Sequence, residues 1–357
     1  MKRKVIGLMA AVSLTVAIGY PANPPAVQWI RPFQPEPWDT IANRVQQTRD
    51  NGFILAGFVR QSDTNPDMFL WKTDSLGNTQ WCRAYGGPKD DGARSVRQTS
   101  DGGYIVAGSG YVNDSLRAIL VKTDSLGNQQ WRYAGPEFSL ADDVVQTRDG
   151  GYAFSGHWSK PYSLHLTKLN AQGNCEWSRQ LPATYSENWT GCRQAVQQTQ
   201  DGGFIVTAEA LLKTDSLGNL QWKKTYPYVE VINSVQQTPD RGFIATGFGP
   251  SPVNPWHTCN VVLLKTDSLG NKVWMRRFRG AFQSAGFCVR QCPDGGYFIC
   301  AAGSSYGPWL IRTDSQGNLL WTMELPVRGR ADEGAPTADG GYIVNAGALI
   351  KLAPDNW

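Results

Sequence analysis

Residues 95–131 contain SVRQT (95–99), DGGYIVAG (101–108), ILVKTDSLGN (119–128) and QW (130–131), and the same unit occurs seven times along the chain. Its Asp-Gly-Gly element, in which Asn51 and Arg241 each replace one glycine, begins at Asp50, Asp101, Asp149, Asp201, Asp240, Asp294 and Asp339. Its Lys-Thr-Asp element begins at Lys72, Lys122, Lys168, Lys213, Lys265, Arg312 and Lys351. A spacing of about 46 residues is typical of propeller blades.

Each copy of the unit divides into four short segments with the pattern of β-strands. SVRQT and the segment around each tryptophan alternate polar and apolar residues, whereas YIVA and ILV are apolar and β-branched. The sequence DSLGN (74–78) suits a hairpin turn, because an aspartate caps backbone N–H groups and glycine accepts a positive φ. The repeat therefore predicts an all-β fold, a seven-bladed β-propeller of four-stranded antiparallel blades.

A tryptophan recurs in the fourth segment of each copy, and we expect these side chains to be structural and to pack between neighbouring blades. They are Trp29, Trp81, Trp131, Trp177, Trp222, Trp274 and Trp321. The first of them lies in VQWIRPF (27–33), which resembles TQWCRAY (79–85), and the chain ends at Trp357, soon after the last Lys-Thr-Asp element. We therefore predict that the N-terminal strand completes the last blade and closes the ring.

The N-terminal residues have the pattern of a signal peptide. Residues 2–4 are basic (KRK), residues 5–18 form an apolar run, and Ala17 and Gly19 are small residues before a cleavage point. An uncleaved membrane anchor is the alternative, although the run is short and rich in small residues. The pattern predicts a protein that is secreted, periplasmic or on the cell surface.

The remainder of the chain is expected to form one domain. We predict a signal peptide over 1–20 and a single seven-bladed propeller over 21–357, monomeric and with no membrane span after cleavage. The formal net charge is +4 for the whole chain, and loss of the three basic residues at 2–4 leaves 4 − 3 = +1. A charge this small does not favour a nucleic-acid partner.

Seven cysteines lie along the chain without any CxxC pair, which argues against a zinc site. They are Cys82, Cys175, Cys192, Cys259, Cys288, Cys292 and Cys300. The last three stand where the second copy has serine, threonine and alanine, so we interpret them as small strand residues. The hairpin register that we expect places Cys300 opposite Val289 and predicts no bond between Cys300 and Cys288. Whether other cysteines pair stays open.

The run KTDSLGNxxW, followed by YGG and DGGYIVAG, resembles the repeats of secreted bacterial β-propeller proteins, many of which carry a C-terminal sorting tail. The resemblance covers nearly all of the mature chain. It implies the fold and export but little about activity, because those proteins are mostly uncharacterised. This chain differs from many of them in ending at Trp357 without a sorting domain.

One part of the unit, DxxGNxxW, is also similar to the tryptophan-docking repeat of pyrroloquinoline quinone propellers. The dehydrogenases of that group add an adjacent Cys-Cys pair and a calcium-linked acidic site, and this chain has no adjacent cysteines. We therefore expect no cofactor. A calcium loop is an alternative for the turn aspartates, but one carboxylate per turn provides few ligands, so we expect no metal.

Antiparallel blades place the DGG and DSLGN turns on one face, here called the turn face, and the remaining connections on the other, here called the loop face. The loop-face connections are long and differ between blades, as is typical of binding loops. Aromatic residues there can stack on sugar rings or anchor a protein partner, or can simply cover the blade ends. The candidate ligand-binding residues are Trp38, Tyr111, Trp158, Tyr162, Trp189, Trp256, His257, Tyr306 and Trp309.

Two loop-face connections are short. The segments 203–213 and 341–351 have room only for tight hairpins, whereas the corresponding segments of the other copies are longer. These two copies stand nearly across the ring from each other. We therefore predict a groove over the loop face between blades four and seven.

No catalytic motif is present, and we assign no catalytic residue. HExxH and P-loop sequences are missing, and the one GxSxG match, GSSYG (303–307), is not followed by the helical period that a nucleophile elbow requires. The histidines are His157, His165 and His257. Carboxylates that recur before the first strands are expected to cap turns, although a glycosidase or lyase could assemble an acid and a base from separate loops. These carboxylates are Asp90, Asp91, Asp142, Asp143, Glu187 and Glu333.

The first strands share a glutamine, with Pro336 in the seventh copy. We expect a hydrogen-bonded ring around the channel rather than a ligand site, formed by Gln47, Gln98, Gln146, Gln198, Gln237 and Gln291.

The leading hypothesis is an exported, non-enzymatic propeller that binds a glycan or a protein through its loop face. One alternative is a carbohydrate-active enzyme, a glycosidase or lyase, on the same fold. Another is a structural module of a surface protein.

Overall fold

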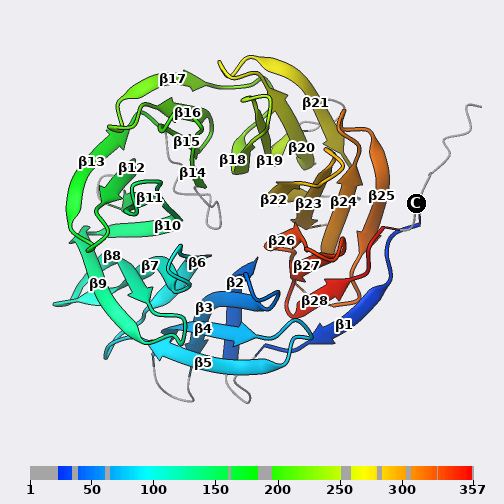
Figure 1. Ribbon diagram of the computed structural model, residues 1–357. Helices are drawn as coiled ribbons and strands as arrows, with labels where there is room; N and C mark the ends of the chain where they lie inside the picture. Colours follow the sequence, from blue (N-terminus) through cyan, green and yellow to red (C-terminus); the bar gives the residue numbers. More distant parts are fainter. Residues whose placement is uncertain are drawn as a thin grey trace, which may run out of the picture.

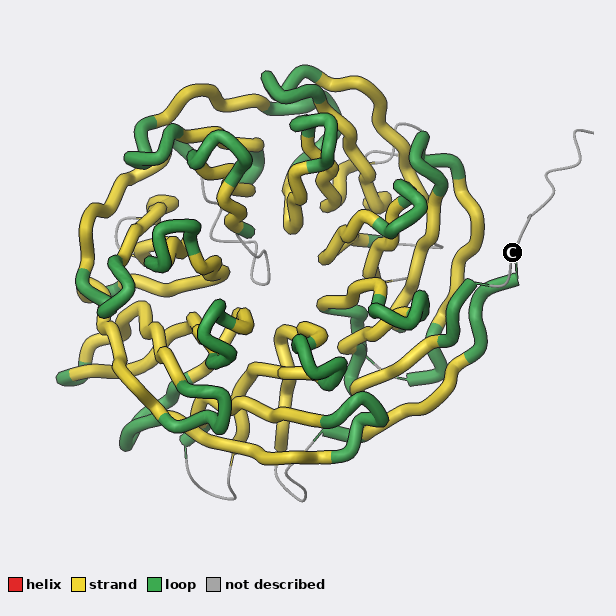
Figure 2. Tube along the Cα trace, viewed as in Figure 1, coloured by secondary structure: helices red, strands yellow, loops and turns green. Residues whose placement is uncertain are grey.

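The computed structural model describes residues 23–33, 39–60, 65–159, 162–183, 195–250, 259–279, 284–302, 307–327 and 329–355. These ranges form seven four-stranded antiparallel sheets arranged in a ring (Figure 1). All their regular elements are strands, as Figure 2 shows. Within the same ranges, no helix has the length and apolar character needed to cross a membrane. The predicted seven-bladed β-propeller is confirmed.

The strands follow one another from the centre of the ring to its rim in each blade. Blade one contains β2 (Asp39–Gln47), β3 (Phe53–Arg60), β4 (Asp67–Thr73) and β5 (Thr79–Tyr85); blade two contains β6 (Gly92–Gln98), β7 (Tyr104–Val112), β8 (Ser115–Thr123) and β9 (Gln129–Glu137). Blade three contains β10 (Ser139–Gln146), β11 (Tyr152–Ser159), β12 (Tyr162–Leu169) and β13 (Cys175–Leu181); blade four contains β14 (Val196–Gln198), β15 (Phe204–Thr207), β16 (Leu211–Thr214) and β17 (Leu220–Lys224). Blade five contains β18 (Val231–Gln237), β19 (Phe243–Pro250), β20 (Cys259–Thr266) and β21 (Lys272–Phe278); blade six contains β22 (Ala285–Gln291), β23 (Tyr297–Ala302), β24 (Pro308–Thr313) and β25 (Leu319–Glu324). Blade seven contains β26 (Glu333–Pro336), β27 (Tyr342–Asn345), β28 (Leu349–Leu352) and β1 (Val27–Arg31).

The N-terminal strand closes the ring. β1 pairs antiparallel with β28, with Trp29 opposite Lys351 and Arg31 opposite Leu349. Figure 1 shows the blue β1 beside the red β28 at the rim of blade seven. Blade seven is therefore built from both ends of the described chain, as the displaced tryptophan segment predicts, and β28 is not left as an open edge.

In each of the seven copies of the repeat, the tryptophan side chain packs against the next blade. Trp81 meets Tyr104 edge-on at a centroid distance of 5.8 Å, and its ring covers Gly127 of the next DSLGN turn, where an added Cβ would lie 2.9 Å away. Gly127 has a φ of +80°, so the turn itself also favours glycine. The other six pairs are Trp29–Phe53, Trp131–Tyr152, Trp177–Phe204, Trp222–Phe243, Trp274–Tyr297 and Trp321–Tyr342.

A buried lysine joins the two most regular motifs within each blade. Lys122 Nζ donates to Asp101 Oδ2 at 2.8 Å, to the Thr123 carbonyl at 2.8 Å and to Gln130 Oε1 at 3.0 Å. Burial opposes ionisation of Asp101, but hydrogen bonds from Lys122 and Thr99 outweigh it and lower its pKa to about 2. The carboxylate of the DGG turn therefore neutralises the buried lysine of the same blade. The equivalent pairs span 2.5 to 2.9 Å, with Arg312 replacing lysine in blade six.

A β-bulge interrupts the first strand of five blades. In blade one it falls between Ala42 and Arg44, and the bulged Asn43 donates its Nδ2 to the Ala93 carbonyl of blade two at 2.7 Å. The remaining bulges lie between Ala93 and Ser95, Ala141 and Asp143, Ile232 and Ser234, and Gly286 and Cys288. The bulge turns one extra side chain toward the neighbouring blade.

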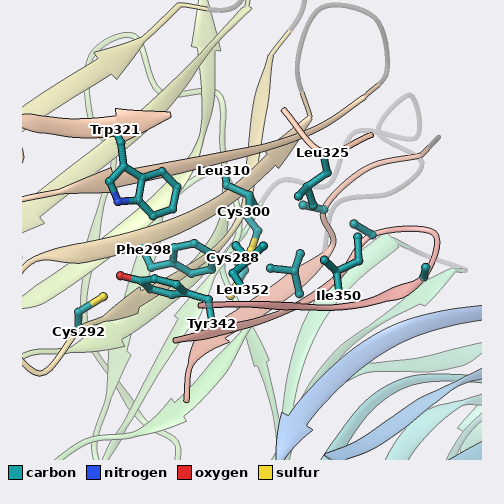
Figure 3. Packing of buried hydrophobic residues seen from close by; sticks show 14 residues of the cluster. Cys288, Cys292, Phe298, Cys300, Leu310, Trp321, Leu325, Tyr342, Ile350 and Leu352 are labelled. Carbon is teal, nitrogen blue, oxygen red and sulfur yellow. The ribbon is translucent and has the colours of Figure 1, made fainter. Parts of the chain in front are cut away.

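The hairpin of blade six corrects the predicted cysteine register. Cys300 lies opposite Cys288, not opposite Val289, because the turn pairs Gln291 with Tyr297 and the register runs unbroken from there to Cys288. Figure 3 shows Cys288 and Cys300 together in the core between blades six and seven. Both are free thiols, as are Cys82, Cys175, Cys259 and Cys292, and Cys192 lies outside the described residues.

Candidate functional site

On the loop face, the side chain of Trp158 stacks on a neighbouring histidine. It lies near the end of β11, half-buried, and stacks on His165 with centroids 4.0 Å apart and planes 11° from parallel. Ser163 Oγ lies 3.0 Å from His165 Nε2. Burial lowers the pKa of His165 to about 4, so the imidazole is neutral at pH 7. The indole therefore rests on a flat, uncharged ring that fixes its orientation.

Three more aromatic side chains are exposed on the loop face of blades two and three. Tyr162 opens β12 and is 42% exposed, and Tyr111 lies near the end of β7 with Lys89 Nζ 5.4 Å from its ring centroid. Phe138 lies in the connection between β9 and β10 and is 40% exposed. With Trp158 these residues are called the aromatic set below.

Phe138 also has a strained backbone. Its φ is +62°, a conformation that bulky L-residues rarely adopt, and its N–H donates to the Leu116 carbonyl at 2.7 Å. Tyr228, in the connection between β17 and β18, repeats the combination with a φ of +63° and 60% exposure. The sequence analysis missed both residues, since nothing in a short connection signals a positive φ at an aromatic position.

The other aromatic candidates divide into two groups. Trp309 corrects the prediction: it lies in β24, is 8% exposed and packs with Phe278 and Ile311, because the strand begins one residue earlier and turns the indole into the blade interface. Tyr111, Trp158 and Tyr162 likewise belong to strands rather than loops, because those hairpins extend further than expected. Five candidates lie outside the described residues: Trp38, Trp189, Trp256, His257 and Tyr306.

The predicted groove is described at its two ends and, along its walls, at the blade-two hairpin β7–β8. The hairpins β15–β16 and β27–β28 are tight, as expected from their length. The segments expected to wall the groove include 61–64, 160–161, 251–258 and 303–306, which lie outside the described residues. The groove therefore stays a prediction.

Asp142 and His157 form a buried pair at the loop-face end of blade three. Asp142 Oδ2 lies 3.0 Å from His157 Nδ1, and Arg94 Nη1 of blade two donates to Oδ1 at 2.7 Å. Burial raises the pKa of Asp142, but Arg94 and His157 outweigh burial and hold it below its usual value. Because Asp142 is buried and satisfied, it joins two blades rather than facing a substrate.

The central channel holds a second buried charge cluster. Asp143 of blade three lies 3.1 Å from Arg44 Nη2 of blade one and 3.4 Å from Arg97 Nη2 of blade two. Ser95 Oγ donates to Asp143 Oδ1 at 2.6 Å, and the Val196 N–H donates to Oδ2 at 3.2 Å. Burial raises the pKa of Asp143, but the two arginines outweigh burial and keep the carboxylate ionised.

Glu333 of blade seven completes this cluster. Arg44 Nη1 and Arg290 Nη2 donate to its two oxygens, and Cys288 Sγ donates to Oε1 at 3.2 Å. Burial would raise the pKa of Glu333, but Arg290 and Arg44 lower it to about 2. Five blades therefore meet at one carboxylate-guanidinium network, since Arg44 also contacts Asp143.

The repeat contains a signal for this cluster that the sequence analysis did not use. Asp143 and Glu333 were expected to have structural roles, and Arg44 was not singled out. Three residues before the shared glutamine, most copies have a small residue, and three have a charge. The seven residues at this position are Arg44, Ser95, Asp143, Ala195, Ser234, Cys288 and Glu333.

Five of the six shared glutamines form the hydrogen bonds of the predicted ring, whereas the donor position for Gln291 is Pro239, which has no N–H. The Oε1 of Gln98 accepts the Arg49 N–H of the preceding blade at 2.9 Å, and that of Gln146 accepts the Ser100 N–H at 2.7 Å. Equivalent bonds of 2.8 to 3.0 Å reach Gln198, Gln237 and Gln47. Backbone donors occupy these carbonyl oxygens, so the ring joins the blades.

A cavity of about 350 Å³ lies in the channel beside this ring. It is lined by the charge cluster and by side chains one residue before the shared glutamines, including Gln46, Arg97, Gln197, Gln236 and Arg290. This volume is within the range of small-molecule sites.

The comparisons with known proteins place the chain among propellers. No family model and no curated protein matches the sequence. The structure resembles a streptogramin B lyase at 11% identity with a TM-score of 0.60, over 92% of this chain and 98% of that one. It also resembles the Pan2 WD40 domain of Neurospora crassa at 9% identity with a TM-score of 0.59, over 89% and 90% of the two chains. A third match, at 9% identity and a TM-score of 0.55, is to an extracellular domain from B. thetaiotaomicron and covers 92% of this chain and 40% of that one. At such identities the likeness shows the fold alone.

Proposed function

We propose that this chain is an exported, non-enzymatic scaffold that binds a glycan on its loop face, with the aromatic set as the binding surface. The stack of Trp158 on His165 carries the proposal. An indole held flat by a neutral ring presents its other face without the entropy cost of ordering a free side chain, and sugar rings stack on such surfaces.

The strain at Phe138 supports the same surface. A positive φ at a bulky residue costs roughly 1–2 kcal/mol, and strain of this kind gathers at functional positions. Phe138 is nevertheless 40% exposed. Display of the ring toward a ligand accounts for both observations.

Glycan arrays probed with residues 21–357 test the proposal. Trp158→Ala should abolish the signal, and Phe138→Gly should weaken it while leaving the fold equally or more stable, because glycine adopts the positive φ without strain. If Phe138→Gly binds glycan more weakly but is equally or more stable, the loss of binding does not come from misfolding. Leu126→Ala, at an exposed residue of a turn-face DSLGN turn, should leave binding unchanged.

Other results would replace the proposal. Glycan turnover abolished by replacing one loop-face carboxylate would favour the alternative carbohydrate-active enzyme. A protein ligand that binds through Trp158, with a silent glycan array, would favour the protein-binding form of the scaffold. If no glycan binding, no glycan turnover and no protein binding were detected, the remaining hypothesis would be a structural module of a surface protein.

A further inference from the structure

The channel cavity has more positive than negative charge. Its charged lining residues, among those the structure describes, are three arginines and two carboxylates, so the net charge is 3 − 2 = +1. They are Arg44, Arg97, Arg290, Asp143 and Glu333. Burial and the neighbouring arginines hold the pKa of Arg97 below its usual value despite Asp143 and Glu333. Three guanidinium groups therefore share two carboxylates.

Arg44 has donors that the protein does not satisfy. The residue is 2% exposed, and its Nε is buried without a hydrogen-bond partner. Its Nη2 makes an ion pair with Asp143 at 3.1 Å but no hydrogen bond of acceptable geometry. A buried, unsatisfied donor on a charged group is unfavourable unless a ligand or a water supplies an acceptor.

The uncharged polar lining of the cavity also consists of donors. Gln46, Gln197 and Gln236 each use Oε1 to accept a backbone N–H of the following blade, at 2.6 to 2.8 Å. Because a backbone N–H can only donate, these bonds leave the amide NH₂ groups as the free polar atoms of the three side chains. Together with Arg97 and Arg290, donors come from five blades at this level.

We propose that the central channel binds a small organic or inorganic anion with several acceptor oxygens, a carboxylate or a phosphate. The site lies between the charge cluster of Arg44 and the ring of shared glutamines. Guanidinium groups bind such oxygens through paired, charge-assisted hydrogen bonds, and the amide donors would complete the shell. This site is separate from the glycan surface proposed for the loop face.

The test uses residues 21–357 in calorimetric titrations with sodium phosphate and sodium glucuronate. Sodium chloride at matched ionic strength controls for screening, and glucose is the neutral analogue of glucuronate. Saturable binding is expected with at least one of the two anions and not with glucose. Binding of phosphate alone would assign an inorganic or phosphoryl ligand, and binding of glucuronate alone a sugar acid or other carboxylate.

Arg97→Gln combined with Arg290→Gln removes two of the three cations, and three copies of the repeat already have glutamine there. Because the two arginines also pair with Asp143 and Glu333, a melting curve first establishes that the double variant is folded. The double variant should bind the anion roughly tenfold more weakly or worse, since two charge-assisted contacts are lost. Arg117→Gln, which breaks an ion pair with Glu137 away from the cavity, should bind as the unchanged protein does. Equal affinity in the double variant, or no response beyond that to chloride, would overturn the proposal.

Discussion

Glu333 shows how a single side chain can link blades that are distant in sequence. It bonds to Arg44, 289 residues away, and to Arg290 of the preceding blade. The bond to Arg44 is buried and the bond to Arg290 is partly buried, so the carboxylate must stay ionised for the first strands to keep their positions around the channel.

The stability contribution of Glu333 should depend on pH in a defined direction. Its pKa falls from an ordinary value of 4.5 to about 2 on folding. Because the pKa of Glu333 is lower in the folded state, its ionised carboxylate stabilises the fold fully above pH 4.5. This stabilisation is lost as the pH falls from 4.5 through 2. The shift corresponds to an effect on the order of 3 kcal/mol.

Comparison of the unchanged protein with Glu333→Gln isolates this effect. Urea unfolding at pH 7, 5, 4 and 3 should give a stability difference that is largest at pH 7 and 5 and narrows at pH 4 and 3. Lys89→Met, which removes an exposed ion pair with Asp114, serves as the control and should change stability by less than about 0.5 kcal/mol. A gap between Glu333→Gln and the unchanged protein that stays constant with pH would contradict the assignment.

Single positions were also where sequence-based prediction was weakest. Trp309 was assigned to a loop, but β24 begins at Pro308, so Trp309 is a strand residue that packs into the blade interface. The ionic contacts of Arg44 join residues hundreds of positions apart, which no local pattern reveals. By contrast, the aspartates of the DGG turns could be interpreted locally, because Asp101 accepts the Gly103 N–H two residues away at 3.0 Å.

At the level of elements, blades dock through an indole laid over a glycine turn. In blade two, Gly127 and Gly102 have similar backbones, with φ of +80° and +87°. Only Gly127 is covered by Trp81, whereas an added Cβ at Gly102 would meet nothing within 4 Å. The two positions therefore separate the cost of the backbone from the cost of docking.

Alanine at each position should show the difference. Gly102→Ala should cost about 1–2 kcal/mol from the positive φ alone. Gly127→Ala should cost roughly 1–3 kcal/mol more, because the methyl group pushes the indole from its seat. Denaturant unfolding measures both, and equal losses would show that the contact between Trp81 and the turn contributes nothing.

The number and order of elements could be predicted because the repeat marks every strand and turn. The bulges could not. They insert one residue without a glycine or proline at the bulged position, as at Asn43 and Asp142, so no local signal marks them. The register of β22 with β23 was misjudged separately, because the turn pairs Gln291 with Tyr297 and so places Cys288 opposite Cys300.

For the whole molecule, closure by β1 should control both stability and association. Deletion through Phe33 removes the contact of Trp29 with Phe53 and leaves β28, with its buried Leu349 and Ile350, as an open edge. Open apolar edges pair with other chains.

The truncated chain should unfold at least about 10 °C lower and self-associate. Trp29→Ala in the full chain removes the indole but keeps the strand, so a smaller loss without association is expected. Calorimetry and light scattering distinguish the two variants. An unchanged melting temperature and a monomeric truncated chain would show that β1 is dispensable.

The ring could be predicted from the sequence, but its candidate sites only partly. Repetition identifies what all blades share, whereas binding depends on what one blade does alone, such as the stack of Trp158 on His165 or the charge of Arg44 in the channel. Several loop-face aromatic candidates also lie outside the described residues.

Blade seven is built from both ends of the described chain, and this determines where the molecule can be attached to a support. The Ala353 N–H donates to the Ala26 carbonyl at 2.9 Å, at the place where every other blade has a DSLGN-type turn. A linker on the N-terminal or the C-terminal side of the described chain would therefore begin at the same place on the turn face. A propeller anchored in this way would hold its aromatic set outward, away from the support.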